Sequence, residues 1–209
     1  MKEELIANIV AMEWTMFQKV ANIGGRAACQ DDRGTFSIMR SSQAMAWSEP
    51  ALASYLEDLT EAEATGRNLL TEKYARMMEF TAPLEYAQIQ HHLPPLEQET
   101  HVLIDQIAEI SLAWTKEIST KFPYISKRGR PASAAGDTPY TTSIETYLRG
   151  ELATYSPRTL ALYYQNVLEQ KAANINGAEI TLAATMQQYG FTSLAEANEV
   201  VRLKTQRKE

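Results

Sequence analysis

The sequence predicts an all-α protein, an irregular bundle of about eight or nine helices with no substantial sheet. Along most of the chain, apolar residues recur at steps of three and four, which is the spacing of amphipathic helices. Serine followed closely by proline, a signal for the start of a helix, occurs at Ser48 and again at Ser156. No segment sustains the alternation of apolar and polar residues that indicates a strand.

The first half of the chain predicts five helices. The first runs to about Val20, and the pair Gly24–Gly25 ends the helical pattern. The polar segment 26–34 lacks periodicity and is expected to be a loop. The helices that follow are expected at 35–47, from Ser48 to about Gly66, from about Leu70 to Pro83, and in a short stretch that ends near His92.

In the second half, the longest helix is expected at 96–121. Residues 122–140 contain three prolines and two glycines and predict a long loop, of a length that is often functional or mobile. Helices resume after a capping box formed by Thr142 and Glu145, after Ser156, over 177–189, and after a second box, Ser193 with Glu196. The tail at 203–209 is expected to fray.

Composition favours one soluble domain over 1–209. Of the 209 residues, 44% are hydrophobic and 22% are charged, the balance of a globular domain. The net charge of −6 disfavours binding to nucleic acid or to anionic membranes. No apolar stretch approaches the ~20 residues of a membrane span. With an acidic N-terminus and the single cysteine Cys29, these features lead us to expect a cytoplasmic protein.

Polar residues are densest between Ile23 and Met45, beside the glycine pair. Arg26, Arg40 and Arg67 are predicted to hold an anion, because guanidinium groups bind carboxylate and phosphate through two hydrogen bonds. Cys29, Asp31 or Asp32 would supply acid–base or nucleophilic chemistry. The remaining candidates for the ligand site are Gln30, Trp47 and Tyr74. The alternative is that the arginines form structural salt bridges with Asp31, Asp32, Asp58 and Glu72.

Two other motifs carry less weight. His91, His92 and His101 match neither the zinc spacing nor the di-iron spacing found on helices, so we predict no metal and no cofactor. Residues 128–131 read RGRP, which is the core of a minor-groove-binding arm. A single copy in an acidic protein disfavours nucleic acid, and the alternatives are a lid that closes over an anionic ligand or a plain connecting loop.

Four segments of the chain read EWTMFQKVANIGGRAACQDD, TFSIMRSSQAMAW, GRNLLTEKYARMMEFTAP and TSIETYLRGELATYSPRTLALYY. They resemble a bacterial family of unknown function, catalogued as domain of unknown function four-one-two-five. The similarity covers about residues 4–200. It implies a bacterial protein of one domain and of about this length, and it implies neither a reaction nor catalytic residues.

The leading hypothesis is an enzyme or a ligand-binding protein that acts on a small anionic metabolite, with catalysis left open. The alternative is a helical interaction module without chemistry, as a homo-oligomer or bound to another partner. Its support is the content of 10 Tyr, 8 Met and 3 Trp, residue types that are enriched at interfaces.

Overall fold

The computed structural model describes residues 1–22, 25–138 and 140–207. Across these residues the chain forms eleven α-helices and three short 3-10 helices, with one isolated bridge between Thr138 and Thr141 and no strand. The all-α prediction is therefore confirmed. The helices exceed the expected eight or nine in part because a one-turn helix forms within the segment predicted to be a loop.

The α-helices are α1 (Lys2–Gln18), α2 (Arg33–Met45), α3 (Glu49–Ala64), α4 (Leu69–Thr81), α5 (Pro83–Ile89), α6 (Gln98–Lys121), α7 (Pro123–Ser126), α8 (Ile144–Leu152), α9 (Pro157–Ala172), α10 (Gly177–Gln188) and α11 (Leu194–Gln206). The 3-10 helices are η1 (Ala28–Asp31), η2 (Gln90–His92) and η3 (Ala134–Gly136).

Serine side chains begin several helices as the sequence predicts. The hydroxyl of Ser156 accepts the backbone N–H of Thr159 at 3.2 Å, and Ser193 accepts that of Glu196 at 3.1 Å. The predicted box at Thr142 is wrong by one residue, because Ser143 caps α8 through the N–H of Thr146 at 3.1 Å. The sequence predicts that the pair Gly24–Gly25 ends the first helical pattern. In the structure α1 ends at Gln18, and Gly24 lies outside the described residues.

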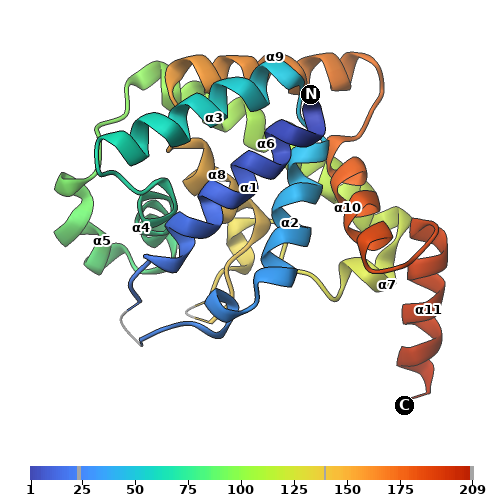
Figure 1. The fold of residues 1–209 in the computed structure, drawn as a ribbon. Coiled ribbons are helices and arrows are strands. Elements are labelled where there is room, and N and C mark those ends of the chain that lie inside the picture. The colour runs from blue at the N-terminus through green and yellow to red at the C-terminus, as the bar shows by residue number, and fades with distance from the viewer. Residues whose placement is uncertain (23–24, 139, 208–209) are drawn as a thin grey trace.

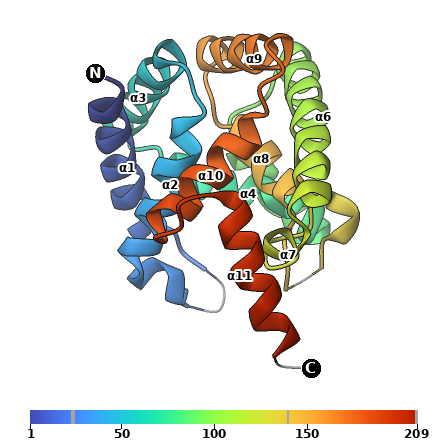
Figure 2. The same cartoon turned by 90° about the vertical axis from the view of Figure 1, so that its right-hand side faces the viewer.

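One apolar core joins helices from both sides of the segment 122–140. It includes Ile9 of α1, Leu59 of α3, Ile107 of α6 and Leu160 of α9. In Figure 1, α1 and α2 lie side by side in front of α8, and α9 crosses above them beside α6. A smaller apolar cluster connects α7 with α11, whose C-terminal end extends away from the bundle in Figure 2.

Two helices approach each other closely at a glycine. Gly150 of α8 faces α4, and a Cβ atom at this position would lie 2.6 Å from Met77 Cγ and 3.0 Å from the carbonyl oxygen of Lys73. The missing side chain therefore sets how near α8 comes to α4.

The segment 122–140 is fastened to the start of α8. The backbone N–H groups of Ile144 and Glu145 donate to the carbonyls of Pro131 and Ala132, at 2.8 and 3.1 Å. The carboxylate of Asp137 accepts from Ser143 N–H and from the Thr146 hydroxyl. The described part of this segment is therefore held against the start of α8 by hydrogen bonds. At the C-terminus α11 continues to Gln206, and residues 208–209, the end of the tail that is expected to fray, lie outside the described residues.

Within the described ranges, none of the helices combines the length and the apolar character needed to cross a bilayer.

Candidate functional site

Four ionised side chains from four helices meet inside the bundle. They are Glu13 of α1, Arg40 of α2, Lys73 of α4 and Glu151 of α8, and we call them the charge cluster. Each of the four segments that carry the family resemblance contributes one member. The fold therefore brings those segments together at a single point.

Arg40 joins the two carboxylates. Its Nε donates to Glu13 Oε2 at 2.7 Å, and its Nη2 donates to Glu13 Oε1. Toward Glu151, Nη1 and Nη2 donate to separate oxygens at 3.0 and 2.8 Å. Lys73 Nζ completes the cluster at 2.5 Å from Glu151 Oε2. Because both contacts of Arg40 use two donors, the guanidinium fixes the orientation of both carboxylates.

Neutral side chains occupy the remaining acceptor positions. Tyr55 OH donates to Glu13 at 2.8 Å, and Tyr155 OH donates to Glu151 at 3.0 Å. Gln43 donates from Nε2 to Glu151 at 3.1 Å and accepts from Arg40 at 2.8 Å. Glu13, Arg40 and Glu151 thus each have several polar partners, as a buried charge requires, whereas Lys73 is paired with Glu151 alone.

The cluster is removed from water and is electrically balanced. The side chains of Glu13, Glu151, Lys73 and Arg40 are 1%, 4%, 8% and 13% exposed. Burial opposes the charged form of Glu151, but Arg40 and Lys73 outweigh it and hold the pKa of this carboxyl well below its usual range. Burial lowers the pKa of the Lys73 ammonium, and Glu151 counters only part of that effect. Two negative and two positive charges therefore stabilise one another.

This arrangement leaves little room for a ligand. The cavity beside Arg40, Glu13 and Trp47 has a volume of about 10 Å³, which is at most the space of one water molecule. All four charges already have partners, so an incoming anion would have to displace a carboxylate. In this conformation the cluster positions α1, α2, α4 and α8 relative to one another.

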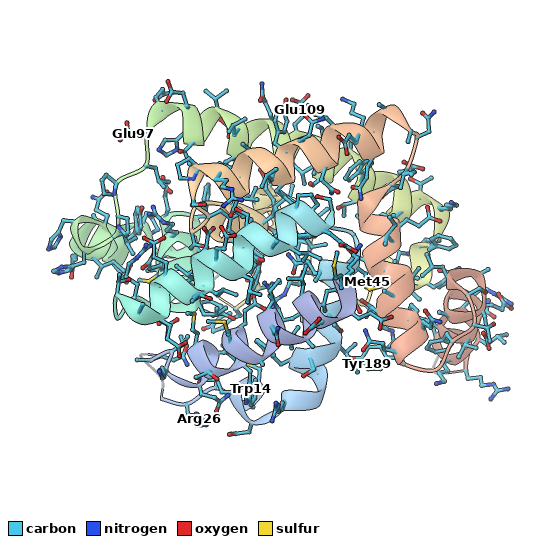
Figure 3. All side chains as sticks on the ribbon, turned by 45° about the horizontal axis from the view of Figure 1, so that its top comes forward. Trp14, Arg26, Met45, Glu97, Glu109 and Tyr189 are labelled. Carbon is cyan, nitrogen blue, oxygen red and sulfur yellow. The ribbon has the colours of Figure 1, made fainter. Side chains whose placement is uncertain are left out.

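The three predicted anion-binding arginines lie in different surroundings. Arg26 is exposed at the edge of the molecule, where its Nε donates to Asp31 at 2.8 Å (Figure 3). Arg67 is exposed and donates to Glu72 at 2.9 and 2.7 Å. Arg40 alone is inside, within the charge cluster. These contacts favour the alternative of structural salt bridges over one common anion site.

The polar residues near Arg26 have structural roles. Gln30 is buried; its Nε2 donates to the carbonyls of Phe17 and Val20 at 2.9 and 3.0 Å, which anchors η1 to the end of α1. Asp32 caps α2 by accepting the N–H of Thr35 at 2.9 Å, and that bond lowers the pKa of the Asp32 carboxyl. Asp31 is the partner of Arg26.

The other predicted residues separate into two places. Trp47 is buried beside the charge cluster, with its ring 5.6 Å from that of Tyr55. Tyr74 packs against Phe17 and Tyr147, with ring centroids 6.1 and 6.2 Å apart. Burial raises the pKa of Tyr74, and the nearby Tyr147 and the exposed thiol of Cys29 raise it further. Tyr74 thus lies with Phe17 and Tyr147, whereas Trp47 lies beside Arg40.

Sequence reasoning passed over Glu13 and Glu151, although both carry a signal. Glu13 lies between Ile9 and Met16 on the buried face of α1, and Glu151 precedes the buried Leu152. A carboxylate on an apolar helical face requires a buried partner. This pattern is the sequence signal that Glu13 and Glu151 belong to buried ion pairs.

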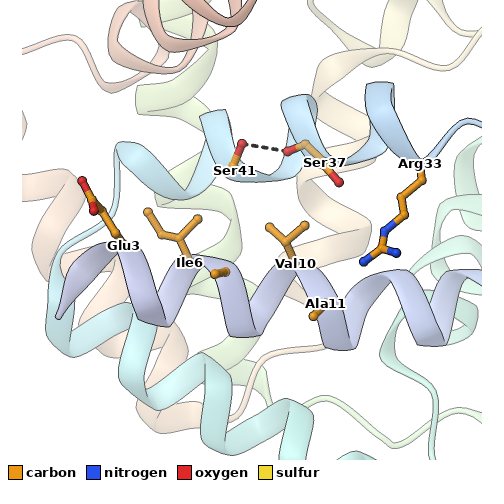
Figure 4. Close-up of a pocket in the computed structure, with 8 residues that line it drawn as sticks. Glu3, Ile6, Val10, Ala11, Arg33, Ser37 and Ser41 are labelled. Atoms are coloured by element: carbon orange, nitrogen blue, oxygen red, sulfur yellow. Dashed lines mark hydrogen bonds between the residues drawn. The ribbon is translucent and has the colours of Figure 1, made fainter.

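A larger cavity lies on the surface between α1 and α2. Its volume is about 240 Å³, and we call it the α1–α2 groove (Figure 4). It is lined by Glu3, Ile6, Ala7, Val10, Ala11, Arg33, Ser37 and Ser41. In Figure 4 Glu3 and Arg33 stand at opposite ends, with Ile6 and Val10 between them. Among the described residues, Arg33 makes no ion pair and no side-chain hydrogen bond.

The remaining motifs do not form a further chemical centre. His91 and His92 are exposed in η2, with ring centroids 3.9 Å apart, and His101 is exposed on α6. In the part of the chain that is described, no group of three or more His, Cys, Asp or Glu residues could hold a metal ion. Arg130 of the RGRP motif stacks on Tyr147 at 4.3 Å and donates to the carbonyl of Thr142 at 3.1 Å.

Comparison with known proteins gives one match. A family model described as "Protein of unknown function (DUF4125)" matches residues 3–199. No curated protein and no solved structure matches the chain.

We predict that Arg40→Met strongly destabilises the fold. The substitution leaves two buried carboxylates with Lys73 as the only cation, and breaking a buried ionic network typically costs about 3–5 kcal/mol. Arg26→Met is the matched control, because it removes an exposed pair worth at most about 1 kcal/mol. Urea denaturation measures both. Equal losses in the two variants would show that the charge cluster does not hold the helices together.

We also predict that the fold is sensitive to acid because of Glu151. Its folded pKa lies below the unfolded value of about 4.3, so its stabilisation is complete above that pH and is lost as the pH falls toward the folded pKa. We expect the free energy of unfolding to decrease below about pH 4.5 and to decrease less steeply in Glu151→Gln. Urea denaturation across this pH range is the measurement, and parallel curves for the two proteins would contradict the assignment.

Proposed function

The chain belongs to the DUF4125 family, and we propose that it binds a small organic anion with an elongated apolar body in the α1–α2 groove. The observation that carries the proposal is the Arg33 guanidinium, which lacks a protein partner among the described residues and stands at one end of a cavity of about 240 Å³. Such a group is suited to a carboxylate or a phosphate.

The rest of the groove favours an apolar ligand body. Ile6 and Val10 lie along it, and the small side chains of Ala7 and Ala11 leave it open. Burial of a hydrocarbon chain against these residues would contribute roughly 25 cal/mol per Å² of apolar surface. The hydroxyl of Ser41 donates to the carbonyl of Ser37 at 2.7 Å, so it is already engaged.

The two ends of the groove define the charge and the length of the ligand. From Glu3 to Ala11 the helix rises by about 12 Å, which is close to the length of a medium-chain carboxylate. The carboxylate of Glu3 repels a second negative charge at the far end, so we propose a monoanion. The eight lining residues include no histidine, cysteine or lysine, and the proposal is therefore binding, without a reaction.

This proposal keeps the anionic ligand of the sequence hypothesis but moves the site. Arg33 takes the place of Arg26, Arg40 and Arg67, whose donors are used within the protein. We include a cytoplasmic location in the proposal, because a free, exposed thiol such as Cys29 is typical of reducing compartments.

Octanoate is the probe for the groove, and isothermal titration calorimetry is the measurement. We expect octanoate to bind the wild type and to bind Arg33→Gln at least about tenfold more weakly, the effect of one lost charge-assisted hydrogen bond. Octanol has the same chain without the charge and should bind both proteins equally. Arg158→Gln, which removes an exposed arginine on α9, should bind octanoate like the wild type.

A variant that fills the groove separates this site from unspecific binding. Ala7→Phe should abolish octanoate binding, whereas Ala195→Phe, at an exposed position of α11, should not. The proposal fails if the wild type does not bind octanoate, or if Ala7→Phe binds it as the wild type does.

A second candidate function, self-association, is favoured by the charges at the ends of the groove. Two copies in antiparallel contact would place Glu3 of one copy against Arg33 of the other, as a two-fold interface requires. We expect light scattering to detect a dimer that is lost in Glu3→Arg and restored in the double variant Glu3→Arg, Arg33→Glu. A monomer at high protein concentration would exclude this candidate.

A further inference from the structure

Arg76 of α4 is a buried cation without a counter-charge. It is 7% exposed, and among the described residues no carboxylate lies within ion-pair distance of its guanidinium. Its Nη2 donates to the carbonyl oxygen of Pro94 at 2.6 Å, and the Tyr86 hydroxyl is a second hydrogen-bonding neighbour. Its Nε is enclosed and has no acceptor, which is rare for a buried polar atom.

The arginines whose burial is most similar to that of Arg76 have carboxylate partners. Arg40 faces Glu13 and Glu151, and the partly buried Arg149 faces Asp105 and Glu145 at 2.6 and 2.9 Å. A charge that leaves water without an opposite charge is costly. Burial accordingly lowers the pKa of Arg76, which its neighbours only partly offset. The molecule therefore holds a positive charge that an external anion would stabilise.

The charged groups around Arg76 do not neutralise it. They are Glu72, which is engaged with Arg67, the exposed Glu79, and Arg67 itself, whose positive charge opposes that of Arg76. Tyr86 of α5 is half-buried, and its hydroxyl lies beside the guanidinium. α5 buries none of its own residues and lies at the periphery of the bundle in Figure 1, so it is a thin cover over this part of α4.

We propose that Arg76 and Tyr86 form a binding site for an oxyanion group, a phosphate or a carboxylate, between α4 and the segment 83–95. The guanidinium of Arg76 would donate to an incoming oxygen, and the Tyr86 hydroxyl beside it would be the second donor. This site is separate from the α1–α2 groove and does not depend on the function proposed there.

Glu79 is the competing partner. It lies three residues after Arg76 on α4, so a change of its side-chain rotamer could bring its carboxylate toward the guanidinium. If Glu79 neutralises Arg76 in solution, no external anion is needed. The experiment therefore includes a variant at each of the two positions.

The test follows thermal unfolding with inorganic phosphate and, separately, with acetate, each at constant ionic strength set by sodium chloride. We expect a saturable rise in the melting temperature of the wild type with at least one of the two anions. Phosphate alone would indicate a phosphate-bearing ligand and acetate alone a carboxylate, and either supports the site. Arg76→Met should lose the rise, and its melting temperature without anion should equal or exceed that of the wild type, because an unpaired charge has been removed.

Three further variants complete the design. Glu79→Gln should bind the anion more tightly, since a nearby negative charge is gone. Arg158→Met controls for the loss of a surface arginine, and Arg33→Gln controls for the groove; both should respond as the wild type does. If Arg76→Met does not fold, NMR spectroscopy of the wild type replaces it. The Nε–H resonance of Arg76, identified by its loss in Arg76→Lys, should then shift saturably as the anion is added.

The proposal is overturned if neither anion raises the melting temperature of the wild type, or if Arg76→Met keeps the full rise. It is also overturned if the anion stabilises only Glu79→Gln, because that result assigns the guanidinium to Glu79.

Discussion

The double bridge from Arg40 to Glu13 and Glu151 is the contact on which the arrangement of this bundle depends. The three side chains come from α2, α1 and α8 and are almost fully removed from water. In such surroundings each charge tolerates only a small displacement of the others, because electrostatic interactions are strong where solvent does not screen them. Apolar packing holds the helices together, whereas the cluster selects one arrangement among those that would bury similar apolar area.

The charge cluster has a structural role and is not where we propose that a ligand binds. An electrically balanced network beside a cavity of about 10 Å³ leaves little room for a ligand. Among the described residues, Arg33 beside the α1–α2 groove and the buried Arg76 beneath α5 are two cations without an ion-pair partner. The two binding sites that we propose therefore lie at the periphery of the bundle, whereas the charge cluster lies in its interior.

Sequence periodicity predicted the helices well because helical order is local. Ser48, Ser156 and Ser193 begin helices through contacts to residues three positions later, which a reader of the sequence can see. Salt bridges of short range are accessible in the same way, as in Arg26 with Asp31. The charge cluster is different, since Arg40 and Glu151 are 111 positions apart. The local sequence pattern does not indicate which distant residue forms an ion pair with a buried charge.

Gly150 connects the backbone to these charges. It immediately precedes Glu151, and it lies against α4 at the turn that carries Lys73. The absent side chain allows the two helices to come near enough for the carboxylate of Glu151 to meet the ammonium of Lys73 at 2.5 Å. A relative of this chain with a larger residue at this position would need a shorter side chain in place of Met77, or a longer reach across the helix pair. A change in the distance between α4 and α8 would therefore also change how well Lys73 is neutralised.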